Sequence, residues 1–90
     1  MANRGRFEII RDILEIIKIS NNYIQFTPLL RKSNASSSRF KKYYAWVLEK
    51  GLVMEVVDNR GNKYISLTEK GFKFLEKYET IVNFIEEFEL

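Results

Sequence analysis

The 90-residue sequence contains no cysteine and no histidine. Without cysteine there is no disulfide framework and no thiolate metal site. Without histidine the chain lacks the Ser-His-Asp and Cys-His triads, and also the commonest metal ligand and general base near neutral pH. No convergent set of acid, base or metal-binding residues stands out elsewhere. We therefore expect a protein that is not an enzyme and that has no catalytic residues, no metal and no cofactor.

Long apolar runs are also missing. None approaches the roughly 20 residues that cross a bilayer, and the first ten residues, MANRGRFEII, lack the apolar core of a signal peptide. The chain is nevertheless 46% hydrophobic and 14% aromatic, which is ample for a packed core. These features predict one small, soluble cytoplasmic domain that does not associate with a membrane.

Acidic residues are absent from the middle of the chain. Residues 1–50 carry ten Lys/Arg and four Asp/Glu, a net +6, whereas residues 51–90 carry five and eight, a net −3. No acid occurs between Glu15 and Glu49, but six bases do. An acid-free basic stretch predicts a polyanionic partner. The alternative is a solvated cationic surface without a partner.

Helical periodicity dominates the first third of the chain. Apolar residues at positions 10, 13, 14 and 17 follow the i, i+3, i+4, i+7 rule and predict an amphipathic helix over 6–19. Ser20-Asn21-Asn22 is expected to end it, because these side chains compete for backbone hydrogen bonds. Thr27-Pro28 predicts the N-cap and first residue of a short helix over 28–33.

A third helix is predicted over 37–50, after a tight turn at Asn34-Ala35. Ser36 is the expected N-cap, and Gly51 is expected to end the helix. The predicted core-facing residues of this helix are Phe40, Tyr43, Tyr44, Val47 and Leu48. Trp46 flanks that face, and we interpret it as a half-buried rim residue in preference to a nucleic-acid contact.

Strand patterns follow Gly51. Residues 52–57 and 63–67 predict two strands, and the turn between them is rich in residues that tolerate positive φ. The result is a β-hairpin with a basic tip. Thr68 is then expected to cap a last helix that runs nearly to Leu90.

The predicted order of elements is that of a winged helix-turn-helix domain, an α+β, mainly α fold with three helices, a β-hairpin wing and a long C-terminal helix. We expect residues 1–68 to form the DNA-binding domain and 69–90 a dimerisation helix, in a single compact unit. Helix N-termini, hydroxyls and basic side chains suit phosphate and guanine contacts. The predicted DNA-binding residues are Thr27, Arg31, Lys32, Ser36, Ser37, Ser38, Arg39, Lys41, Lys42, Arg60 and Lys63. The alternative is a winged-helix protein–protein interaction module without DNA affinity.

Three segments resemble those of archaeal winged-helix regulators: SRFKKYY (38–44), LEKGLV (48–53) and TEKGFKFL (68–75). With its size and long last helix, the chain is similar to the archaeal 10a-type chromatin proteins over nearly its whole length. The resemblance implies a nucleoid-associated protein that binds double-stranded DNA as a transcription regulator or an architectural chromatin protein. It also implies a homodimer joined by an antiparallel coiled coil.

The last helix predicts a dimer independently of that resemblance. A helix of about 22 residues is ~33 Å long, more than the core of a small domain can cover. Residues 69–77 carry a net +1 and residues 78–90 a net −4, which favours antiparallel pairing. The alternative is that this helix packs on its own domain, against the helix over 6–19. The predicted coiled-coil seam consists of Phe74, Tyr78, Ile81, Val82, Ile85 and Phe88.

Overall fold

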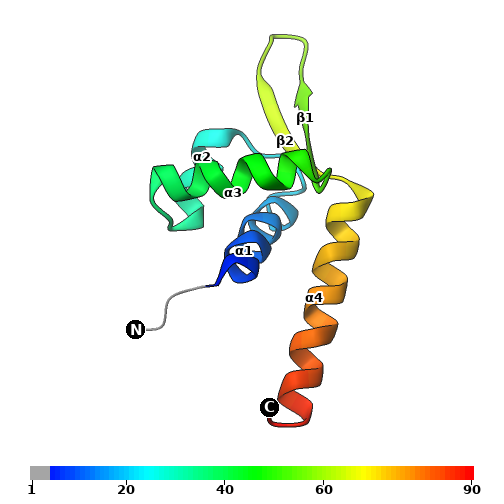
Figure 1. The fold of residues 1–90 in the computed structure, drawn as a ribbon. Coiled ribbons are helices and arrows are strands. Elements are labelled where there is room, and N and C mark those ends of the chain that lie inside the picture. The colour runs from blue at the N-terminus through cyan, green and yellow to red at the C-terminus, as the bar shows by residue number, and fades with distance from the viewer. Residues whose placement is uncertain (1–4) are drawn as a thin grey trace.

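The structure, a computed structural model, describes residues 5–90, so the first four residues of the predicted DNA-binding domain lie outside it. Its elements in chain order are α1 (Arg6–Ile19), α2 (Phe26–Ser33), α3 (Ser37–Glu49), β1 (Val53–Val57), β2 (Lys63–Leu67) and α4 (Glu69–Glu87). The hairpin projects from one end of the helical body, and α4 starts beside the base of the hairpin and runs in the opposite direction (Figure 1). The predicted α+β, mainly α fold, a winged helix-turn-helix with a long C-terminal helix, is confirmed.

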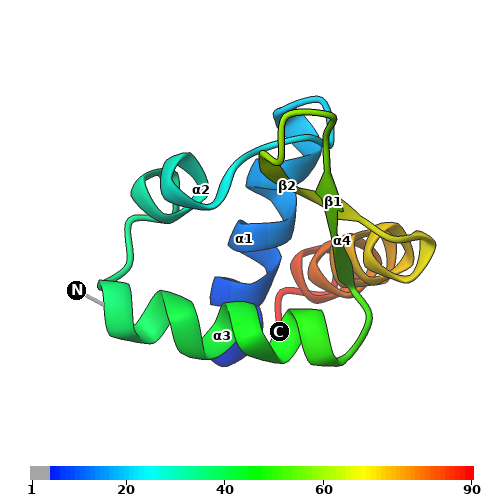
Figure 2. The ribbon, with the colours of Figure 1, turned by 90° about the horizontal axis from the view of Figure 1, so that it is seen from above.

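Helix α1 forms the centre of the core and lies between α2, α3 and α4 (Figure 2). Its apolar face is fully covered: Ile9, Ile10, Ile13, Leu14 and Ile17 are each at most 1% exposed. Burying each such side chain stabilises the fold by roughly 1.5–3 kcal/mol. The predicted break after Ile19 is confirmed, because Asn21 and Asn22 both adopt left-handed φ values.

Helix α2 begins earlier than the sequence predicted. Its N-cap is Gln25 and its first residue is Phe26, so Thr27 lies inside the first turn and the predicted Thr27 cap was wrong. The Phe26 ring packs edge-on against Phe40, with 5.2 Å between centroids, and against Tyr44. This aromatic contact brings Phe26 into the helix. Pro28 is still accommodated, because it remains within the first turn, where its missing N–H costs nothing.

Helix α3 begins at the predicted residue, Ser37, and ends at Glu49, one residue before the predicted end. The Ser36 hydroxyl accepts a hydrogen bond from the Arg39 N–H at 3.3 Å, which confirms Ser36 as the N-cap. At the other end Gly51 adopts φ +75°, and its N–H donates to the Leu48 carbonyl at 3.1 Å. The Leu52 N–H reaches back to the carbonyl of Val47, completing a Schellman motif.

The inner face of α3 is narrower than predicted. Phe40, Tyr44 and Val47 are buried, whereas Leu48 is 37% exposed. Tyr43 is half-buried at the edge of the core. Because α1, α2 and β1 cover α3 from one side only, the helix buries three side chains and leaves its outer side to solvent.

The hairpin pairs β1 with β2 in antiparallel register, with Val57 opposite Lys63. The Asp58 carboxylate accepts hydrogen bonds from the backbone N–H groups of Arg60 and Asn62, both at 2.9 Å. These hydrogen bonds lower the pKa of Asp58. An isolated bridge between Ile24 and Ile65 adds a third extended segment beside the hairpin.

The joint between α3 and α4 is held by the two motifs that the sequence singled out. Thr68 accepts from the Gly71 N–H as the predicted N-cap, and its own hydroxyl donates to the Gly51 carbonyl. The Lys70 ammonium donates to the Lys50 carbonyl at 2.7 Å. The EKG and TEKG segments therefore contact each other, and the start of α4 is fixed to the end of α3.

Replacing Gly71 with alanine is expected to destabilise the protein. A Cβ at this position would collide with the carbonyl oxygen of Leu52, a backbone atom that cannot rotate away. The overlap should lower the free energy of unfolding by roughly 1–3 kcal/mol, in spite of the ~1 kcal/mol that alanine gains in helix propensity. Urea denaturation at fixed protein concentration measures the change. Lys73→Ala, at an exposed position of the same helix, is the control, and equal stability of Gly71→Ala and the parent would contradict the expectation.

Candidate nucleic-acid interface

The N-terminal half of α3 presents its polar residues to solvent. Phe40 and Tyr44 hold the inner side of the helix in the core, so the intervening residues face outward. The exposed residues of this half are Ser37, Ser38, Arg39, Lys41 and Lys42, all of which the sequence predicted as DNA contacts. Ser36 is also exposed, but its hydroxyl is engaged as the cap. The structure thus brings hydroxyls, positive charge and a helix N-terminus together on one surface.

Helix α2 carries three of the predicted DNA contacts, and one of them differs from the others in its surroundings. Thr27 is exposed in the first turn, and Arg31 is exposed in the last turn. Lys32 is also exposed but lines a shallow hollow with Asp12 and Glu15 of α1. Its side chain therefore lies on the α1 side of the domain, beside acidic residues, and not with the basic residues of α3.

The wing supplies two predicted basic residues, which differ in their surroundings. Arg60 is exposed at the tip, in the turn that Asp58 organises. The Lys63 ammonium lies 3.5 Å from a carboxylate oxygen of Glu55, one diagonal step across the hairpin. Lys63 is therefore already paired within the wing, whereas the guanidinium of Arg60 is directed to solvent.

Glu55 also connects the wing to α3, which the sequence reasoning missed. The Tyr44 hydroxyl donates to the other Glu55 oxygen at 2.6 Å. Burial and this hydrogen bond raise the pKa of Tyr44. The signal available in the sequence was a single acid in an otherwise apolar strand, but nothing there indicated which residue of α3 would meet it.

Trp46 occupies the half-buried rim position that the sequence predicted, packed against the core. The Lys50 ammonium lies 5.8 Å from the centroid of its ring, and Lys42 makes a similar contact with Tyr43. Such cation–π contacts are worth roughly 0.5–1 kcal/mol at exposed sites. They hold the two lysines along one flank of α3.

The outer half of α4 carries large apolar side chains that its own domain leaves uncovered. Among the predicted seam residues, Ile81 is 59%, Ile85 40% and Phe88 57% exposed. Phe84, which the sequence reasoning left out, is 54% exposed, and its ring centroid lies 4.9 Å from that of Phe88. We refer to Ile81, Phe84, Ile85 and Phe88 as the α4 apolar surface. Their spacing of three, one and three residues was visible in the sequence.

The remaining seam residues lie closer to the domain body. Phe74 and Tyr78 are partly buried, and their rings stack with centroids 6.3 Å apart. Val82 is also partly buried, at the edge of the groove between α1 and α4. The alternative in which α4 packs on its own domain therefore describes its first half, where Leu75 is buried, but not its second.

A short helix, a turn and an exposed second helix, followed by a hairpin, define a winged helix-turn-helix domain. No helix in the described part of the chain is long and apolar enough to cross a membrane. The model of the winged helix-turn-helix family matches residues 3–86, and the chain belongs to this family.

Solved structures show the same fold. Sso10a-2, a DNA-binding protein from Sulfolobus solfataricus, superposes with a TM-score of 0.74 at 22% identity over 94% of this chain and 85% of its own. F93 from STIV, a winged-helix DNA-binding protein, gives 0.73 at 19% identity over 89% and 91%. F-93 of SSV1 gives 0.62 at 25% identity over 88% and 91%. The predicted resemblance to the archaeal 10a type is thus confirmed in the fold. Among curated proteins, no relative matches this sequence.

Proposed function

We propose that this chain is a DNA-binding protein that docks α3 in the major groove and lays its wing along the backbone, as a homodimer paired through α4. The observation that carries the proposal is the exposed basic surface of α2 and α3, which has no acid until Glu49. The solved relatives whose names describe them as DNA-binding proteins support it. The protein acts on the nucleoid, as a transcription regulator or an architectural chromatin protein.

The contacts follow from the chemistry of each group. The free N–H groups at the start of α3, with Ser37 and Ser38, suit a phosphate. Arg39 has the planar donor pair that reads guanine, while Lys41 and Lys42 supply charge without base selectivity. Thr27, at the N-terminal end of α2, suits a second phosphate.

Duplex binding as a function of salt tests the function. If Arg31, Arg39, Lys41, Lys42 and Arg60 each meet a phosphate, the logarithm of the affinity should fall with a slope of about −4.5 against the logarithm of the salt concentration. Between 50 and 200 mM salt the affinity would drop about 500-fold. Fluorescence anisotropy with a labelled random duplex gives this slope. An absence of binding at 50 mM salt would favour the winged-helix protein–protein interaction module instead.

The wing makes a separate prediction. Arg60→Ala should lower duplex affinity modestly and reduce the salt slope by roughly one unit, because one phosphate contact is lost. Asn59→Ala, the neighbouring exposed position in the turn, keeps the charge and serves as the control. Identical slopes for the Arg60 variant and the parent would mean that the tip does not touch the backbone.

A further inference from the structure

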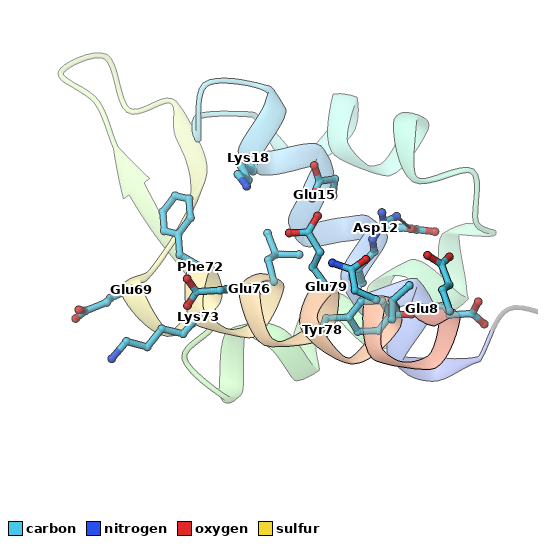
Figure 3. Close-up of a pocket in the computed structure, with 15 residues that line it drawn as sticks. Glu8, Asp12, Glu15, Lys18, Glu69, Phe72, Lys73, Glu76, Tyr78 and Glu79 are labelled. Atoms are coloured by element: carbon cyan, nitrogen blue, oxygen red, sulfur yellow. Dashed lines mark hydrogen bonds and ion pairs between the residues drawn. The ribbon is translucent and has the colours of Figure 1, made fainter. Parts of the chain in front are cut away.

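The groove between α1 and α4 lies outside the basic surface of α2 and α3 and outside the α4 apolar surface. The two helices are in contact near Leu75 and then diverge, because α4 leaves the domain body (Figure 1). The groove between them has a volume of about 820 Å³. Its walls are side chains of α1 and α4. Glu79 points from α4 toward Glu15 of α1, whereas Glu69 and Lys73 extend outward at the start of α4 (Figure 3).

The charge of the groove is opposite to that of α3. Seven Asp/Glu and three Lys/Arg line it, a net −4 in a chain whose total charge is +3. The acids come from both walls, among them Glu8 and Glu15 from α1 and Glu76 and Glu79 from α4 (Figure 3). Arg11 is paired with Asp12, one of these seven acids, at 2.8 Å, so the pair adds no net charge and the other acids outnumber the remaining two lysines.

An apolar line runs along the α4 wall of the groove. Phe72, Leu75, Tyr78 and Val82 succeed one another at steps of three, three and four residues and all line the space. Phe72 is 40% exposed, and its ring stands at the end of the groove near the hairpin and Lys18 (Figure 3). An apolar line bordered by acids is complementary to a helix that carries apolar anchors on one side and basic residues beside them.

Other occupants fit the groove less well. DNA is repelled by its charge. The outer half of α4 from a second copy carries the acids of residues 78–90 and no base, so it is repelled in the same way. Pockets for small ligands are mostly apolar, whereas most of the residues around this groove are charged.

We propose that the groove between α1 and α4 docks a basic amphipathic segment of a partner protein. The groove and the basic surface of α3 lie on different sides of α1, so the segment binds while the DNA-contacting residues stay free. The protein then binds DNA through α3 and a basic partner protein through the groove. This inference does not depend on DNA binding, since the groove binds its segment in the free protein.

The test uses a labelled 18-residue synthetic helix with leucines on one face and lysines on the other, and a matched peptide with glutamate in place of lysine. Fluorescence anisotropy with the full chain at 50 mM salt should show micromolar binding of the lysine peptide only. Glu76→Lys combined with Glu79→Lys should weaken this binding at least tenfold, and Phe72→Ala should weaken it about fivefold. The control combines Glu49→Lys with Glu87→Lys, two exposed acids outside the groove, and should bind like the parent.

Several outcomes overturn the proposal. They are no binding of the lysine peptide, equal binding of both peptides, and an equal loss in the control variant. Sedimentation of the variant that combines Glu76→Lys with Glu79→Lys tests the remaining candidate occupant, a second copy of this chain. A changed oligomeric state with unchanged peptide binding would assign the groove to a second copy of this chain. Circular dichroism verifies the fold of each variant, and Phe72→Ala tests the same groove without a change of charge.

Discussion

Replacing Ile81 with aspartate is expected to convert the proposed dimer into a monomer. Ile81 is 59% exposed in the single chain and lies in the middle of the α4 apolar surface. In a dimer that covers this surface, the new carboxylate would be buried without a partner, at a cost of several kcal/mol. Analytical ultracentrifugation at micromolar concentration measures the outcome. Duplex affinity should fall with it, by about a hundredfold, because two linked domains gain an avidity that one domain lacks.

The matched control for this change is Asn83→Asp. It introduces the same side chain two residues away, at an exposed position on the other side of α4, and should leave the dimer intact. The fold of the Ile81→Asp monomer should persist, because Leu14, Phe40 and Val47 are fully buried without it. A parent that is already monomeric, or an Ile81→Asp variant that stays dimeric, would remove α4 from the assembly. Global unfolding of that variant would show that the whole of α4 belongs to the domain core.

Replacing Lys42 with glutamate is expected to weaken duplex binding by about 10- to 100-fold for every DNA sequence. Lys42 is exposed on α3, opposite the buried side of the helix, so the change leaves the core intact. Reversing a charge near one phosphate removes an attraction and adds a repulsion of order 1 kcal/mol each at the protein surface. Titrations of two unrelated duplexes under the same salt conditions measure whether the loss is uniform.

Lys73→Glu provides the comparison, because it makes the same charge change on α4, away from α3. It should alter duplex affinity less than threefold. If Lys42→Glu bound like the parent, α3 would not belong to the interface. If both variants lost affinity equally, the interaction would report the net charge of the molecule and not a surface on α3.

The helices were predictable because local signals and apolar spacing agree along them. The stripe of α1 and the cap at Ser36 require only the residues of one segment, and both appear in the structure at the predicted positions. The hairpin followed in the same way from turn residues between two apolar runs. The start of α2 could not be predicted in this way, because it depends on the Phe26 ring packing against α3, a contact between separate segments.

The sequence could predict which charged residues of the candidate site are exposed, but not which other residues of the chain they lie beside. Periodicity places Lys41 and Lys42 on the outside of α3, and both are exposed. It cannot show that Lys63 is paired with Glu55, nor that Lys32 lines a hollow with residues of α1, since both depend on how distant segments pack. The groove between α1 and α4 was invisible for the same reason.

The joint between α3 and α4 constrains the geometry of the proposed dimer. Thr68 and Lys70 fix the first turn of α4 to the end of α3 by hydrogen bonds, so no flexible hinge separates the two helices. In a dimer paired through α4, the length of that helix would determine the distance between the two α3 helices. Each residue of α4 adds about 1.5 Å and turns about 100°, and successive major-groove faces recur about every 34 Å along DNA. The number of residues between Thr68 and the α4 apolar surface therefore sets the half-site spacing.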